Sequence, residues 1–173
     1  MNEISDLAKI TSILGIAATT YLFYENNSIF INEYELFTRK TPKAFRGFKI
    51  LHLNNLYGKT FGSENYRLIE KINSLKPDII VTTGNMLTSS LDKDFVFLEL
   101  CKNLRSFYPI YYSIEGCKNL SGKKYEKYRD YLKGLTDIGV ILLNNSKVSL
   151  IKKEDKLNIY GIYIEDEIKS FSF

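Results

Sequence analysis

Short apolar runs alternate with longer stretches of helical periodicity along most of the chain. Four of these runs are dominated by β-branched, leucine and aromatic residues, as strands covered on both faces of a parallel sheet are. They cover Phe48–Leu53, Asp78–Thr83, Pro109–Ile114 and Val140–Leu143. The pattern therefore predicts four buried strands in succession.

Each gap between these strands holds apolar side chains at the spacing of one helix face. The first stretch, Ser63–Leu75, begins with a residue suited to an N-cap and stops before Pro77. The second covers Asp92–Ser106, and the third lies between Lys123 and Gly139, a glycine of the kind that often ends a helix. The order β, α, β, α, β, α, β with short connections favours right-handed crossovers. We therefore expect an α/β fold, a mainly parallel sheet with flanking helices.

Two further strand patterns flank this core. Residues 29–37 are typical of an edge strand, and residues 147–152 and 156–163 alternate around a polar turn as a β-hairpin does. The hairpin pattern leaves four apolar side chains without a predicted partner, so dimerisation over its edge is one way to cover them. These side chains are Val148, Leu150, Leu157 and Ile159.

The N-terminal region contains 15 consecutive uncharged residues, ITSILGIAATTYLFY, at positions 10–24. A helix of this length reaches about 22 Å, whereas the hydrocarbon core of a bilayer is about 30 Å thick. Length alone therefore leaves a buried or interfacial amphipathic helix open beside a membrane span.

Composition excludes some classes of protein. The chain has 173 residues, of which 45% are hydrophobic and 25% are charged, which suits one globular domain with its own core. A net charge of +4 without clustered arginines predicts no nucleic-acid binding. Cys101 and Cys117 form neither a CxxC motif nor a metal-binding spacing, so we expect two free thiols.

Three blocks of sequence carry a family resemblance. They read EYELFTRKTPKAFRGFKILHLNNLY at 33–57, LKPDIIVTTGN at 75–85 and PIYYSIEGCKN at 109–119. In this order and spacing they resemble the membrane-anchored calcineurin-like metallophosphoesterases, whose corresponding motifs contain Ser-Asp-Leu-His, Gly-Asp and Gly-Asn-His-Glu. The likeness extends over about residues 25–165 and covers the first half of a typical family domain.

The resemblance implies an organisation for the whole chain. Residues 1–27 would form an N-terminal membrane anchor, residues 28–165 the first half of a metallophosphoesterase-like α/β sandwich, and residues 166–173 a tail. The anchor would contact membrane lipid and place the protein at a membrane, with its domain outside the cytoplasm, as in similar proteins.

The resemblance also implies where the family's chemistry would lie. Intact relatives hold two divalent metals (Mn, Fe or Zn) on loops that follow the strands, and the metals activate water for attack on a phosphate ester. Here the positions that match the ligands carry Asn55, Tyr57, Asn85, Gly116 and Cys117. Together they lack the carboxylates and imidazoles that such a site needs.

His52, the only histidine of the chain, precedes these positions and is interpreted as a strand residue. The sequence therefore predicts a non-catalytic metallophosphoesterase-like protein with no metal, no cofactor and no catalytic residue. The alternative is a metal-dependent phosphoesterase, as in intact relatives, which would need either a partner chain to supply the missing half and its histidines or a site that these motifs do not reveal.

Overall fold

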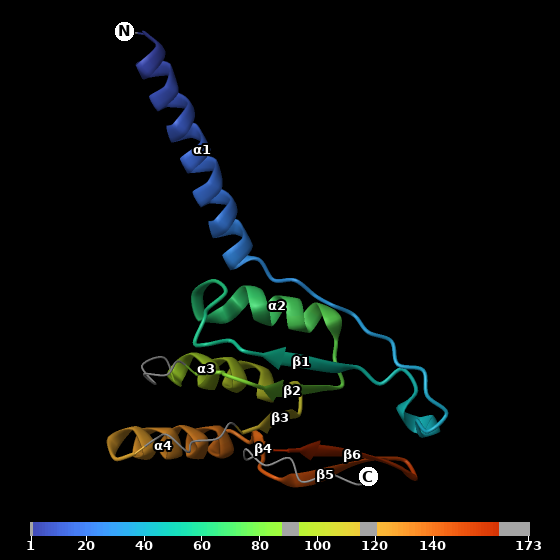
Figure 1. Cartoon of the computed structure of the whole chain (residues 1–173). Coiled ribbons are helices and arrows are strands. Elements are labelled where there is room, and N and C mark those ends of the chain that lie inside the picture. Colours follow the sequence, from blue (N-terminus) through green and yellow to red (C-terminus); the bar gives the residue numbers. More distant parts are fainter. Residues whose placement is uncertain (1, 88–93, 115–120, 163–173) are drawn as a thin grey trace, which may run out of the picture. The chain divides into compact units, whose positions relative to one another are not determined.

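The computed structural model describes residues 2–87, 94–114 and 121–162. The chain divides into two compact units, residues 1–37 and residues 38–173. The second unit contains the α/β core that the sequence predicts (Figure 1).

A four-stranded parallel sheet forms the centre of the second unit. Its strands follow one another in space as they do in the chain, in the order β1 (Ile50–Asn54), β2 (Ile79–Thr83), β3 (Ile110–Ser113) and β4 (Ile141–Leu143). The four predicted strands are thus confirmed. Since all four point the same way, their carboxyl ends lie along one edge of the sheet.

Three helices connect these strands: α2 (Tyr66–Leu75), α3 (Asp94–Arg105) and α4 (Lys123–Asp137). Each helix leads from one strand to the next in the same direction across the sheet. Right-handed crossovers therefore place all three helices on one face of the sheet. The side chains that β2 and β3 place on that face are fully buried, and the Tyr112 ring lies 5.6 Å from the ring of Phe97 on α3. This face contains Ile80, Thr82, Ile110 and Tyr112.

The antiparallel hairpin of β5 (Ser146–Lys152) and β6 (Asp155–Gly161) is also confirmed. Its inward side chains Val148, Leu150 and Ile159 pack against a buried cluster on the other face of the sheet. The cluster consists of Ile79, Tyr111 and Leu143. The four-stranded sheet therefore covers three of the four apolar side chains of the hairpin pattern. Dimerisation over the hairpin edge stays a prediction.

The first turn of the helix predicted at Ser63–Leu75 differs from the prediction. Ser63 does not cap an α-helix; Ser63–Asn65 form a short 3₁₀ helix, η2, and α2 begins only at Tyr66. Glu64 and Asn65 have positive φ angles of 50° and 61°. The Asn65 side chain accepts a hydrogen bond from the Phe61 backbone N–H at 2.9 Å, so it closes the preceding loop and does not cap the helix.

The first unit contains the helix α1 (Asn2–Asn27). The predicted transmembrane anchor over residues 1–27 is wrong, because no helix in the described residues combines the length and the apolar character needed to cross a membrane. Although α1 has 26 residues, its uncharged stretch spans only 15 and ends at Lys9 on one side and Glu25 on the other. The prediction that the protein lies at a membrane was based on this anchor and is wrong as well.

The predicted edge strand at residues 29–37 is also wrong. These residues form neither a helix nor a strand. The side chains of Tyr34, Leu36 and Phe37 are more than four-fifths exposed. Local alternation of side chains was the basis of the prediction, but a strand needs a partner to bond with, and the structure gives this segment none among the described residues.

The structure also contains a short 3₁₀ helix, η1 (Lys43–Phe45), before β1. The Asp155 carboxylate at the start of β6 accepts a hydrogen bond from the Ala44 backbone N–H at 2.7 Å. The Lys152 ammonium lies 5.5 Å from the centre of the Phe48 ring. These contacts join the segment before β1 to the tip of the hairpin.

Candidate functional site

Two loops meet at the carboxyl edge of the sheet, where open α/β sheets place their ligands. β1 and β2 are adjacent and parallel, and Asn54 is in register with Thr83 at their ends. Asn55 and Tyr57 follow β1, and Asn85 follows β2. The structure therefore brings together three of the five positions that the sequence singles out.

Backbone hydrogen bonds hold the two loops against each other. The N–H of Tyr57 donates to the carbonyl of Asn85 at 3.0 Å, and the N–H of Gly58 donates to the carbonyl of Met86 at 2.9 Å. Asn55 and Tyr57 have positive φ angles of 54° and 50°. The left-handed region costs asparagine little conformational free energy and costs tyrosine more. The loop after β1 therefore has a defined and partly strained backbone.

The side chains of the three residues form one hydrogen-bonded group, the amide–phenol cluster of Asn55, Tyr57 and Asn85. Asn55 Oδ1 accepts from the backbone N–H of Asn85 at 2.9 Å and from Asn85 Nδ2 at 3.4 Å. Asn85 Nδ2 also donates to Tyr57 Oη at 2.8 Å. The positions that match metal ligands in the resembling family are thus bonded to one another.

Gly84 allows this cluster to form. Its φ angle of +70° is unfavourable for residues that carry a Cβ atom. A Cβ atom at this position would also collide with the side-chain oxygens of Asn54 and Asn55. Glycine therefore lets the two amides approach the end of β2.

His52 lies in β1, as predicted, and is exposed. Its Nε2 is 2.5 Å from Thr83 Oγ1, so the side chains of the two neighbouring strands are hydrogen-bonded just before the loops begin. Thr83 and Gly84 are not among the five positions that match the family's metal ligands. The signal for both is the sequence TTGN at the end of β2, where polar residues and a glycine directly follow a buried strand.

The donor set of the cluster does not fit a pair of divalent metals. Metals of this kind need anionic oxygen and imidazole ligands, whereas two amides and a phenol are neutral. Asn55 Oδ1 already accepts two hydrogen bonds, which occupy its lone pairs. Within residues 2–87, 94–114 and 121–162, no group of three His, Cys, Asp or Glu side chains is placed to hold a metal ion.

The remaining predicted positions, Gly116 and Cys117, lie outside the described residues. Cys101 is buried on α3, and burial raises the pKa of its thiol. Burial also raises the pKa of Tyr111, an effect that the nearby charge of Arg105 opposes. Both side chains are buried, Cys101 beneath α3 and Tyr111 beneath the hairpin, so we assign them to the core.

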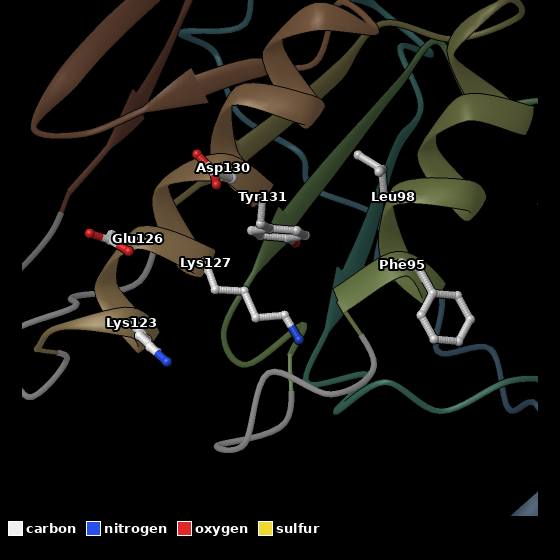
Figure 2. Close-up of a pocket in the computed structure, with 7 residues that line it drawn as sticks. All are labelled: Phe95, Leu98, Lys123, Glu126, Lys127, Asp130 and Tyr131. Atoms are coloured by element: carbon white, nitrogen blue, oxygen red, sulfur yellow. The ribbon is translucent and has the colours of Figure 1, made fainter.

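A cavity of about 480 Å³ lies between α3 and α4. In Figure 2 the Tyr131 ring and the Lys127 chain extend from α4 into this space, and Leu98 extends from α3. Its lining mixes two cations with two carboxylates and includes no residue of the amide–phenol cluster; it consists of Phe95, Leu98, Lys123, Glu126, Lys127, Asp130 and Tyr131. We therefore place the candidate site at the sheet edge, where the loops converge.

Comparison of the chain with models of protein families, with curated proteins and with solved structures gives no match. The resemblance to metallophosphoesterases thus rests on the three sequence blocks and stays a prediction.

Proposed function

We propose that the chain is a non-catalytic, metallophosphoesterase-like binding domain. The observation that carries the proposal is the hydrogen bonding of Asn55, Tyr57 and Asn85 to one another at the edge where relatives of this type would hold metals. A neutral cluster supplies no charge to balance a divalent cation. Without such a cation, water at this edge keeps its ordinary, very high pKa and is a poor nucleophile.

The parallel sheet and the order of the three blocks support the same proposal. The first two blocks end in the loops that form the cluster, so the substitutions affect neighbouring positions of one site. Replacing several ligands of one site removes metal affinity far more completely than replacing one ligand does.

Metal analysis of the full chain tests the proposal. After incubation with Mn²⁺ and removal of the free ion, we expect no stoichiometric manganese and no hydrolysis of bis(p-nitrophenyl) phosphate. One or two ions per chain, with hydrolysis that the Asn85→Ala substitution abolishes, would support the alternative of a metal-dependent phosphoesterase.

The double substitution Asn55→Asp with Asn85→Asp provides a matched comparison. It restores two anionic oxygens at positions that are already adjacent, so we expect it to bind Mn²⁺ more tightly than the natural chain does. Equal affinity of the two proteins for Mn²⁺ would contradict the view that the neutral amides exclude the metal.

A further inference from the structure

We draw no further inference here: the strongest candidate, the exposed apolar surface of helix α1, carries nothing, because side chains such as Leu14, Ile16 and Leu22 lie on different sides of the helix and nothing in the structure shows what covers them.

Discussion

At the scale of single residues, the loops at the sheet edge depend on Gly84. Two separate physical terms make a side chain unfavourable there: the positive φ angle and the collision with Asn54 and Asn55. Gly47 has almost the same φ angle, +71°, but its Cβ direction points into open space. The two glycines therefore separate the cost of backbone strain from the cost of disrupting the cluster.

We predict that Gly47→Ala lowers the free energy of unfolding by about 1 kcal/mol, the cost of placing alanine at positive φ. Gly84→Ala should cost about 1–2 kcal/mol more, because the side chains of Asn54 and Asn55 must rotate away and Asn55 then loses its hydrogen bonds to Asn85. Urea denaturation of both variants measures the difference. Equal losses would show that the contacts of Asn54 and Asn55 add nothing to stability.

The misplaced helix start also belongs to this scale. A serine before a helical stretch is a sound N-cap signal. In the structure, however, the side chain of Asn65 serves the loop, and Glu64 and Asn65 both adopt left-handed backbone conformations. The loop before the helix therefore determines where the helix begins. A local sequence pattern does not encode the shape of that loop.

At the scale of elements, the hairpin is the feature that covers the second face of the sheet. The side chains along β5 and β6 point alternately toward the four-stranded sheet and away from it. Those of Val148, Leu150 and Ile159 pack against Ile79, Tyr111 and Leu143. Ile151 follows Leu150 on the opposite side of β5 and is 77% exposed. One strand thus offers two adjacent aliphatic residues with opposite environments.

We predict that Leu150→Ala lowers the free energy of unfolding by about 2 kcal/mol, because it removes apolar contacts between the hairpin and the sheet. Ile151→Ala should change the free energy by no more than about 0.5 kcal/mol, since its side chain is mostly in water in the native state. Chemical denaturation with a common slope provides both values. Similar costs for the two substitutions would contradict the packing of the hairpin on the sheet.

At the scale of the whole molecule, the chain consists of two compact units, residues 1–37 and 38–173. The last ten residues of the first unit, 28–37, form no helix or strand. They contain Tyr34, Leu36 and Phe37, whose side chains are almost fully exposed. A protease therefore meets little structure that must be broken before it can cleave there.

We predict that chymotrypsin first cuts the native chain after Tyr34, Leu36 or Phe37 and leaves a resistant fragment that begins near residue 38. Mass spectrometry of a timed digest identifies the first products. Phe107 is an internal control, because it is 71% exposed but its backbone N–H is bonded to Leu104 at the end of α3. A first cut at Phe107 would contradict the proposed boundary, and replacing Tyr34, Leu36 and Phe37 by alanine should slow the first cut.

The sequence by itself determined the elements that depend on local patterns. Periodic burial, glycine and proline positions, and short connections were sufficient for the four parallel strands, the three helices between them and the hairpin. They also located the sheet edge at which Asn55, Tyr57 and Asn85 meet, because parallel strands in sequential order bring their carboxyl ends together.

Only the tertiary structure decided what depends on partners distant in the chain. Residues 29–37 alternate like a strand, but the described part of the chain offers them no strand to bond with. Most of the cover over Val148 and Leu150 comes from Ile79 and Tyr111, on strands distant in the sequence. The hydrogen bonds among Asn55, Tyr57 and Asn85 likewise join loops about 30 residues apart. The backbone geometry of the two loops determines which atoms donate and which accept in these hydrogen bonds, and residue types alone do not specify that geometry.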